Sequence, residues 1–589
     1  SLMRKVDKKG RIIEDTGTGG SWPCSTDREV WAIAAYEVYL ETGDVSWLRQ
    51  VYPIIRRSLE ADLMTVYNNS VTGLFRGESS FIDWREQSYP SWMQPSDIAA
   101  SECLGTNAVF YRALEVASLM ASKLGPTRAH DVKRYATIAA NLKRAINDNF
   151  WMEDKGYYAQ FLYGRDYRYV SPRSETLGES LCILWNIASV EQAQRIMENL
   201  RVCDFGPTIF SPQISAQKSY HNNAIWPFVT SFYGMAAAKA GNRAAVMHAL
   251  ASNMRASTVF ESNMENMVAS NGSKNTALNS PRQLWSVAGF EGLFRNVLLG
   301  INYTEDGISF SPCVPTSMKG YRALENFKYR NMTLDVEVIG EGNIVSSCLI
   351  DGVEQQVAFL PASLEGHHNI QLIVKSDYYA PEDSINLGPL EWDLNTPEVE
   401  LSSDGEFLKW AAVNGATNYR IYKNGVFDGQ VEDVLYKVSG KGEYVVAAYN
   451  ESGSYSFMSE PIRVGMSPIE YTIQKRLNNR LGVQVRLEIE VESDGEYLLE
   501  FDYSNGNGDI TTHNRCASRT LFVDKKMYDV VVLPQRGTDW TLRGLTQPLR
   551  IGLTAGKHIV ELKYLEDNVN MNIETDSAVI NSLRIIRAE

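Results

Sequence analysis

The sequence of 589 residues lacks any apolar run long enough to cross a membrane, since a spanning helix needs about 20 such residues. It also lacks a recognisable signal peptide, low-complexity tracts and blocks of like charge. Basic residues are outnumbered by acidic ones, 57 against 71, which gives a formal net charge of −14. Because an acidic chain repels phosphate backbones, we do not expect a nucleic-acid partner. Because the long apolar run is missing, we expect no membrane span.

Cysteine is scarce as well, with seven scattered residues and no Cys-x-x-Cys pair. Zinc sites and disulfide frameworks need closely spaced or patterned cysteines, so the sequence argues against both. We expect most of the cysteines to be small buried apolar residues and the first 300 or so residues to need no cofactor.

Residues 1–302 have the three- and four-residue apolar spacing of amphipathic helices, punctuated by Gly, Pro and Asn. Short turns such as Thr42-Gly43-Asp44 join successive helices, which indicates helical hairpins in series. The longer connections between hairpins hold the aromatic and acidic residues, and such loops usually carry function. The predicted helices are Asp27–Leu40, Val45–Tyr67, Ala99–Leu124, Thr127–Phe150, Pro172–Ala188, Val190–Leu200, Ile225–Ala240, Arg243–Met254 and Pro281–Leu299.

The apolar period changes to two from about residue 303, as expected for half-buried strands. We predict three all-β sandwich domains, at residues 303–385, 386–465 and 466–589. The second, with Tyr419-Arg-Ile-Tyr-Lys-Asn-Gly and Tyr444-Val-Val-Ala-Ala-Tyr, resembles a fibronectin type III module.

The first cluster of candidate catalytic residues is Gly77-Glu-Ser-Ser-Phe-Ile-Asp83-Trp84-Arg-Glu86. An acid between Ile and Trp can be desolvated, which raises its pKa and suits a proton donor at neutral pH. The alternative is a carboxylate that caps a helix or pairs with Arg85.

The second cluster, Tyr220-His221-Asn222-Asn-Ala-Ile-Trp226-Pro227, places polar groups before an aromatic helix start. It can recognise sugar hydroxyls beside a stacking ring, or serve only as a helix cap and core packing.

The third cluster contains Glu261 and Glu265-Asn266, followed by Leu284-Trp285-Ser-Val-Ala. Two glutamates in so polar a loop can supply a general base, although a merely solvated loop has the same composition.

In this order along the chain, the motifs resemble the inverting six-hairpin glycosidases, which include amylo-α-1,6-glucosidases, glycoside hydrolase family 63 α-glucosidases, trehalases and alkaline/neutral invertases. The resemblance covers roughly residues 17–320, and Ser21-Trp22-Pro-Cys-Ser-Thr-Asp27-Arg28 is similar to the family's early substrate-contacting loop. It implies a multidomain protein in which an all-α six-hairpin toroid precedes the sandwiches. A closed toroid needs twelve helices, whereas about nine are predicted, so either some helices are missed or an N-terminal portion is absent.

The resemblance also implies roles for individual residues. Asp83 would be the general acid, with Glu86 as fallback because the loop has one residue more than the family's Glu-Ser-Gly-Trp-Asp spacing. Glu265 would be the general base, with Glu261 as the alternative. Glu179 is a further candidate for the cavity, and the predicted substrate-binding residues are Trp22, Asp27, Arg28, Trp84, Glu175, Tyr220, His221, Asn222, Trp226 and Trp285.

The last domain resembles carbohydrate-binding jelly rolls of families 6 and 35, through Asn505-Gly-Asn507-Gly and Arg515-Cys-Ala-Ser-Arg519-Thr-Leu-Phe-Val-Asp. Such folds can hold a structural Ca²⁺ and bind sugar on loop aromatics, which makes Trp540 the predicted accessory platform. The domain could equally be a spacer.

We therefore expect a glycoside hydrolase that acts on a carbohydrate substrate with inversion, at the end of an α-glycoside, and that is secreted or periplasmic. A non-catalytic carbohydrate-binding protein is the main alternative. A polysaccharide lyase would want more positive charge near the site, and a sugar phosphorylase would want cationic or hydroxyl groups where Glu265 stands.

Overall fold

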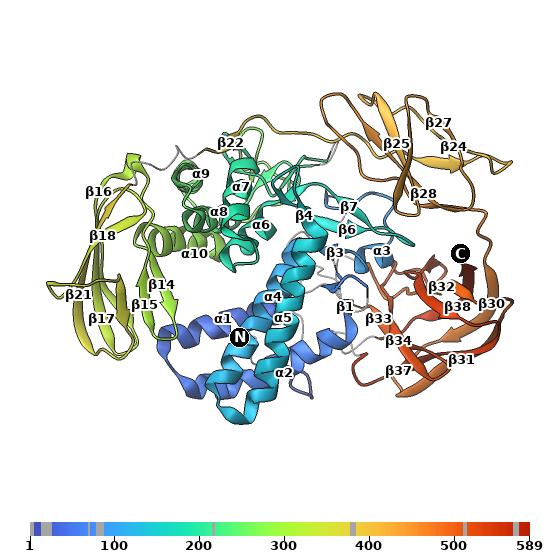
Figure 1. Ribbon diagram of the computed structural model, residues 1–589, viewed down its shortest axis with the longest axis horizontal. Coiled ribbons are helices and arrows are strands. Elements are labelled where there is room, and N and C mark those ends of the chain that lie inside the picture. Colours follow the sequence, from blue (N-terminus) through green and yellow to red (C-terminus); the bar gives the residue numbers. More distant parts are fainter. Residues whose placement is uncertain are drawn as a thin grey trace.

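The computed structural model describes residues 5–12, 26–68, 71–77, 87–214, 218–376, 384–509, 515–568 and 576–588. Within these residues a helical region comes first and extended β-sheets follow (Figure 1). The α-helices are α1 (Asp27–Thr42), α2 (Val45–Thr65), α3 (Pro95–Ala99), α4 (Leu104–Lys123), α5 (Ala129–Phe150), α6 (Thr176–Leu184), α7 (Val190–Asn199), α8 (Pro227–Ala240), α9 (Arg243–Phe260) and α10 (Leu284–Gly292), and a π-helical turn, η4 (Leu293–Leu298), follows α10 directly.

Two of the hairpin turns are built by the same local chemistry. Gly43 and Gly241 close α1 and α8 in the left-handed conformation, with φ of +70° and +81°, which glycine adopts without strain. The next residues then cap the following helices: the side chain of Asp44 accepts from the Ser46 and Trp47 amides, and that of Asn242 accepts from the Ala245 amide. These turns make antiparallel neighbours of α1 and α2, and of α8 and α9.

The hairpins pack side by side in chain order. Helix α1 contacts α4, α4 contacts α6, α6 contacts α8, and α8 contacts α10, while α2, α5 and α9 each cover the first helix of their own hairpin. A single apolar core runs through this region, from Trp31 in α1 to Val297 in η4. The first helices of the hairpins therefore form a continuous inner layer, and the second helices form an outer layer.

Two predicted helices are shorter than their apolar patterns suggested. The segment expected as Ala99–Leu124 begins at the last residue of α3 and contains a two-residue strand before α4, and the segment expected as Pro172–Ala188 holds a strand before α6. Short strands fill the long connections of the helical region: β1 (Tyr67–Asn68), β2 (Leu74–Phe75), β3 (Glu102–Cys103), β4 (Trp151–Met152), β5 (Tyr157–Tyr158), β6 (Phe161–Tyr163), β7 (Tyr169–Ser171), β8 (Ser174–Glu175), β9 (Arg201–Cys203), β10 (Gly206–Pro207), β11 (Phe210–Ser211), β12 (Ala224–Ile225) and β13 (Met267–Val268).

The first set of larger sheets follows η4 and has its own apolar core. A three-stranded sheet has the order β14-β15-β20, and a five-stranded sheet has the order β16-β17-β21-β18-β19, in which β17 and β21 are parallel. The strands are β14 (Ile301–Thr304), β15 (Gly307–Phe310), β16 (Gly320–Tyr329), β17 (Met332–Gly340), β18 (Ile344–Ile350), β19 (Val353–Glu354), β20 (Phe359–Pro361) and β21 (Gly366–Lys375).

The next set comprises a three-stranded sheet, β23-β24-β27, and a four-stranded sheet, β26-β25-β28-β29. Residues from both sheets share one core. The strands are β23 (Val399–Leu401), β24 (Phe407–Trp410), β25 (Asn418–Lys423), β26 (Val426–Val431), β27 (Leu435–Lys437), β28 (Gly442–Tyr449) and β29 (Ile462–Val464).

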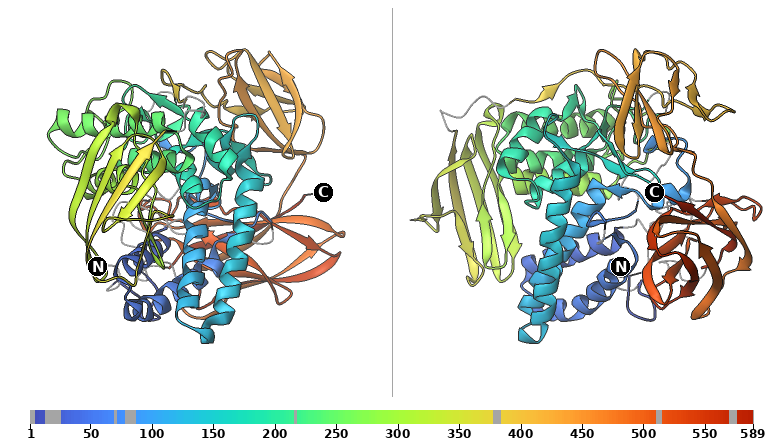
Figure 2. Two further views of the ribbon diagram at one scale, coloured as in Figure 1. Left: turned by 60° about the vertical axis from the view of Figure 1, so that its left-hand side comes forward. Right: turned by 45° about the vertical axis from the view of Figure 1, so that its right-hand side comes forward.

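The C-terminal set has two larger sheets, β30-β38-β32-β35 with β36 on β32, and β31-β37-β33-β34, which also share one core. Its strands are β30 (Ile469–Arg476), β31 (Gly482–Val491), β32 (Gly495–Ser504), β33 (Ala517–Val523), β34 (Lys526–Leu533), β35 (Gly544–Leu545), β36 (Leu549–Leu553), β37 (Gly556–Tyr564) and β38 (Val579–Arg587). The helices lie between this set and the β14–β21 set in Figure 1 and in the right view of Figure 2.

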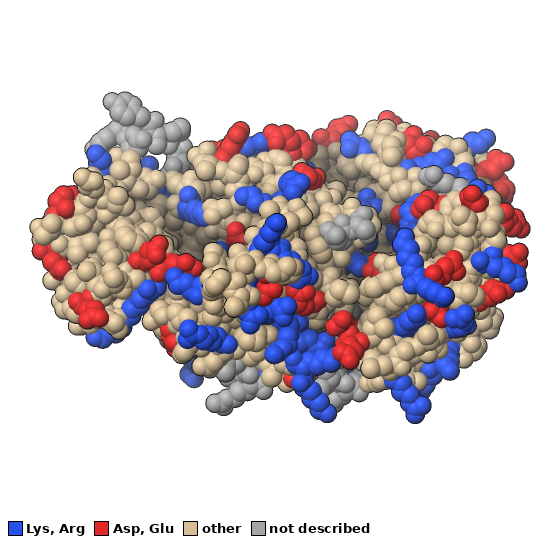
Figure 3. Space-filling view, turned by 60° about the horizontal axis from the view of Figure 1, so that its bottom comes forward, with Lys and Arg blue, Asp and Glu red and all other residues tan. Residues whose placement is uncertain are grey.

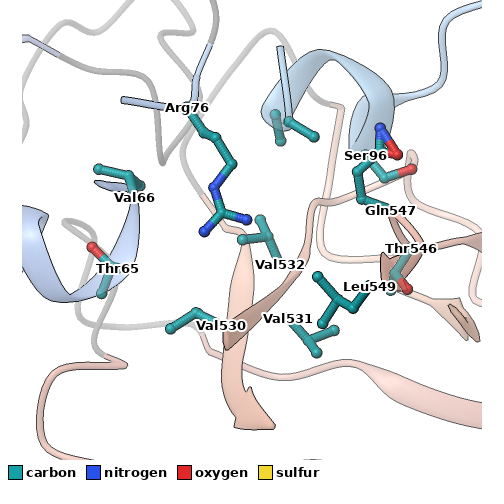
Figure 4. A pocket seen from close by; sticks show the side chains of 12 residues that line it. Thr65, Val66, Arg76, Ser96, Val530, Val531, Val532, Thr546, Gln547 and Leu549 are labelled. Carbon is teal, nitrogen blue, oxygen red and sulfur yellow. The ribbon is translucent and has the colours of Figure 1, made fainter. Parts of the chain in front are cut away.

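The segment that connects the first two β sets packs along the helical region. Strand β22 (Asn386–Leu387) pairs in parallel with β9, and the Asp393 carboxylate forms a buried ion pair with Arg173. The C-terminal set also contacts the helical region, where Arg76 donates to both carboxylate oxygens of Asp529, at 3.0 and 2.6 Å. A cavity of about 30 Å³ beside Arg76 and Val532 marks this interface (Figure 4). The β parts are thus anchored to the helices as well as linked to them.

Charge is unevenly spread over the surface. Figure 3 shows Lys and Arg gathering in the middle of one face, where α2 and α5 lie, although the chain as a whole is acidic. Among the residues that the structure describes, no helix is both long and apolar enough to cross a bilayer. The six cysteines in the described ranges are all buried and form no disulfide with one another.

Candidate active site

The candidate site is built where several helices of the inner layer begin. Strands β12 and β13 pair antiparallel, with Ile225 opposite Met267, and this pairing brings the loop before α8 against the loop that carries Glu265. The backbone of Ile209 links the same place to α6, because its carbonyl accepts from the Thr176 amide and its amide donates to the Ala224 carbonyl. Two of the three clusters identified from the sequence therefore meet in space.

Glu265 is the most notable acid of this site. Its side chain is buried, at 7% exposure, and burial raises its pKa above the ordinary value. The hydroxyl of Tyr220 donates to Oε1 at 3.3 Å, which opposes part of that rise. Its Oε2 has no hydrogen-bond partner among the described residues, and no cation pairs with it there. A carboxyl held in this way accepts a proton more readily than an exposed one, as a general base must.

Backbone contacts fix the position of Glu265 between two loops. Its amide donates to the Ser280 carbonyl at 2.8 Å. The neighbouring Asn266 is fully buried and accepts from Thr276 at 2.6 Å, and the Ser286 hydroxyl in α10 donates to the Met264 carbonyl at 2.9 Å. The start of α10 and the Glu265 loop are consequently one packed unit.

A cluster of aromatic rings continues from Tyr220, which contacts this carboxyl. Trp226 is buried and meets Tyr220 and Trp285 edge to face, with ring centres 5.1 and 5.6 Å apart. Trp285 is 41% exposed and stacks on Phe228, with centres 4.5 Å apart and planes at 16°. The exposed Trp285 offers the flat apolar surface on which a sugar ring can stack, while Trp226 supports it from behind.

Polar groups of the second cluster are held by a residue that the sequence did not single out. The Gln87 side-chain oxygen accepts from the backbone amides of His221 and Asn222, at 2.9 and 3.0 Å. The Asn222 side chain is bonded to the Ile214 backbone in both directions. Burial lowers the pKa of the His221 imidazole to about 3, so the ring is neutral at physiological pH. The sequence feature that could have identified Gln87 as a site residue is its position directly after Glu86 in a polar run.

Other predicted residues lie in different settings. Glu261 is exposed at the C-terminal cap of α9, with φ of +50°. Arg28 is buried and donates to Asp62 at 2.6 Å and to the Ile12 carbonyl at 2.9 Å. Glu175 is buried in β8 at the start of α6, and Glu179 one turn later has a pKa raised well above its ordinary value, by burial first and by Glu175 second. Arg28 is thus held by an ion pair within the protein, whereas Glu265 has no cationic partner among the described residues.

Several predicted residues fall outside the described residues. These are Trp22, Asp83, Trp84 and Glu86, and the side chain of Asp27 is likewise not described. Their roles stay predictions.

Trp540 in the C-terminal set is half-buried, with the Arg476 guanidinium 4.3 Å from its ring centre and Gly506 packed closely against it. Sugar stacking there stays a prediction. The described residues contain no group of three His, Cys, Asp or Glu side chains placed to hold a metal, and residues 510–514 and 569–575 lie outside that search. The calcium ion of this domain stays a prediction.

A family model matches part of the helical region. Residues 18–200 match the bacterial α-L-rhamnosidase six-hairpin glycosidase domain, which places the chain's similarity within the six-hairpin glycosidases and supports a glycoside hydrolase. The match ends before Tyr220 and Glu265. No curated protein matches the chain.

Solved structures give weaker likenesses. A chain named sialidase has 15% identity and a TM-score of 0.45, over 54% of this chain and 31% of its own. The neutral trehalase Nth1 of Saccharomyces cerevisiae has 12% identity and a TM-score of 0.27, over 34% and 38%. The CBM35 of Cellvibrio japonicus Abf62 has 17% identity and a TM-score of 0.15, over 21% and 97%. The chain thus spans about a third of the sialidase chain, and at these scores the likenesses carry no argument.

Proposed function

We propose that this protein is an inverting glycoside hydrolase that removes terminal α-linked sugars, with Glu265 as the general base. The observation that carries the proposal is a buried carboxyl with a raised pKa and no cationic partner among the described residues, set beside an exposed Trp285 that is stacked on Phe228. The similarity of residues 18–200 to a six-hairpin glycosidase domain supports the same chemistry.

In the proposed reaction Glu265 removes a proton from a water molecule, and that water attacks the anomeric carbon. Asp83 donates a proton to the leaving oxygen on the opposite face, with Glu86 as the alternative donor. Inversion needs the two carboxyls to be roughly 6.5–9.5 Å apart, so that water fits between the base and the sugar. The polar groups around His221 and Asn222 bind hydroxyls, and Trp285 stacks on the sugar face. We also propose that the helical hairpins close into a toroid around this site.

Glu265 is favoured over Glu261 as base for a physical reason. Glu261 is exposed on the C-terminal cap of α9, whereas Glu265 is buried and accepts a hydrogen bond from Tyr220. Glu265 is desolvated, so its carboxylate gains more from accepting a proton.

The sugar is proposed from the family description. An α-L-rhamnoside is the first candidate because the matching domain is that of α-L-rhamnosidases. An α-glucoside is the second candidate, from the motif resemblance to amylo-α-1,6-glucosidases and family 63 enzymes. Secretion or periplasmic export of the protein completes the proposal.

The test is hydrolysis of aryl α-L-rhamnoside, aryl α-glucoside and rhamnose-bearing oligosaccharides, followed by proton NMR of the first product formed. We expect release of a sugar whose anomeric configuration is opposite to that of the substrate. A product with the original configuration would contradict inversion.

The variants Glu265→Gln and Glu261→Gln then identify the base. Loss of turnover in Glu265→Gln alone supports the assignment, whereas loss in Glu261→Gln alone moves the base to that residue. Tight sugar binding without turnover in the wild type would favour the non-catalytic alternative.

A further inference from the structure

Besides the small cavity beside Arg76, a larger cavity lies where three parts of the chain meet. Its volume is about 470 Å³, within the range of small-molecule sites. Its walls come from the loop at α3 and the turn after β6, from β28 and β29, and from strands β32 and β38 of the C-terminal set. None of the predicted catalytic or sugar-binding residues lines it.

The lining is rich in arginine. Five arginines stand against four acidic residues: Arg165, Arg463, Arg536, Arg543 and Arg584 against Asp97, Glu443, Glu460 and Glu500. One of these acids contributes little negative charge near neutral pH, because burial raises the pKa of Glu443 to about 8. The wall is therefore dominated by hydrogen-bond donors, since a guanidinium donates and never accepts.

Most of these arginines are also used to join the three parts. Arg463 donates to Asp166 of the helical region at 2.6 and 2.8 Å and to Glu500 of the C-terminal set at 3.0 Å. Arg165 binds both oxygens of Asp97 at 3.0 Å within the helical region and pairs with Glu460 of the second β set at 2.9 Å. These pairs hold the cavity open as a fixed junction of the fold.

Arg536 differs from the other four. It pairs with no carboxylate among the described residues. Its Nη2 donates to the neutral Gln94 side chain at 2.6 Å, and its Nε and Nη1 are buried without a hydrogen-bond partner there. Its guanidinium is packed against Gly544, where a Cβ atom would stand 2.2 Å from Cζ, so any larger residue would displace it. Arg584 pairs through Nη1 with Glu500 at 3.1 Å. Among the described residues, the cavity thus has one positioned guanidinium without a carboxylate partner and a second guanidinium held from one side by Glu500.

We propose that this junction cavity binds a small oxyanion, with Arg536 and Arg584 as its ligands. A carboxylate on a sugar-sized body fits the volume, and the neutral side chains of Gln94, Ser96 and Thr546 on the same wall suit its hydroxyls. Guanidinium groups recognise carboxylate and sulfate oxygens by charge-assisted hydrogen bonds. The site is independent of the glycosidase chemistry proposed at Glu265.

The test is calorimetric titration of the whole protein with sodium glucuronate, sodium sulfate and glucose at constant ionic strength. We expect saturable binding of an oxyanion and none of glucose. Tighter binding of glucuronate than of sulfate identifies an acidic sugar as the ligand, and equal binding identifies an inorganic oxyanion as sufficient; both support the site.

Variants locate the binding. Arg536→Gln and Arg584→Gln should each weaken oxyanion binding by about tenfold or more, because each removes a charge-assisted hydrogen bond. Arg486→Gln is the matched control: Arg486 lies in the same part of the chain, pairs with Glu561 and does not line the cavity. Thermal unfolding checks that each variant is folded. The proposal is overturned by wild-type affinity in both cavity variants, by equal loss in the control, by glucose binding as tightly as glucuronate, or by no saturable oxyanion binding.

Discussion

The Glu265 site and the junction cavity handle carboxylates in opposite ways. At the first, a buried carboxyl accepts a hydrogen bond from Tyr220 at 3.3 Å and has no cationic partner among the described residues. At the second, Asp166 and Glu500 are almost completely buried, but each is bound by arginine. Burying an unpaired carboxylate costs free energy and shifts its pKa, whereas pairing it restores the charged form. The comparison indicates that pairing serves assembly at the junction, while its absence leaves Glu265 able to exchange a proton.

The largest effect is expected from removing the unpaired acid. Glu265→Gln should reduce kcat by about a thousandfold, within the 10²–10⁴ range typical of general acid–base groups. The melting temperature should stay near that of the wild type, because no ion pair of the described residues is broken. Steady-state kinetics and thermal unfolding measure the two quantities. A kcat within twofold of the wild type would remove Glu265 from the mechanism.

A large loss of stability is expected from breaking the paired network. Arg463→Met leaves Asp166, whose side chain is fully buried, without its cation, and such losses cost about 3–5 kcal/mol. Urea unfolding of the whole protein measures the change. The double variant Arg463→Met/Asp166→Asn should recover part of the loss because the buried charge is gone. No recovery would show that the ion pair is not the cause.

Glu443 gives a smaller effect that depends on pH. Burial raises the pKa of its carboxyl in the folded protein to about 8, against an ordinary value near 4.5. The folded state holds this proton more tightly than the unfolded chain, so the stabilisation is complete below about pH 4.5 and is lost as the pH rises through about 8. The melting temperature of the wild type should therefore fall more between about pH 6 and pH 9 than that of Glu443→Gln. Equal falls would contradict the shift.

The smallest effect is expected from Tyr220→Phe. The Tyr220 hydroxyl favours the charged form of Glu265, so its removal should raise the pKa of that carboxyl further. The base is active only when deprotonated, and the acidic limb of the kcat/KM profile should move to higher pH. Activity near neutral pH should fall by a few-fold, as about 1 kcal/mol for one hydrogen bond implies. An unchanged pH profile would show that this contact does not tune the base.

The sequence by itself determined much of the helical layer. Turns such as Thr42-Gly43-Asp44 contain their own reasons to end one helix and begin the next, because the αL glycine and the capping side chain act within a few residues. The change from helical to strand spacing near residue 303 is equally local, and β14 begins at Ile301. Patterns that depend only on neighbours in the chain could be predicted in this way.

Tertiary structure decided which acids differ from the rest. Glu261 and Glu265 stand four residues apart in one polar loop, and nothing in their immediate sequence separates them. The pairing of β12 with β13 buries Glu265 beside Tyr220 and leaves Glu261 in water. Likewise, Arg28 resembles a substrate ligand in sequence, but the fold places it against Asp62. Burial and partners arise from residues distant in the chain, and they set the pKa and availability of each group.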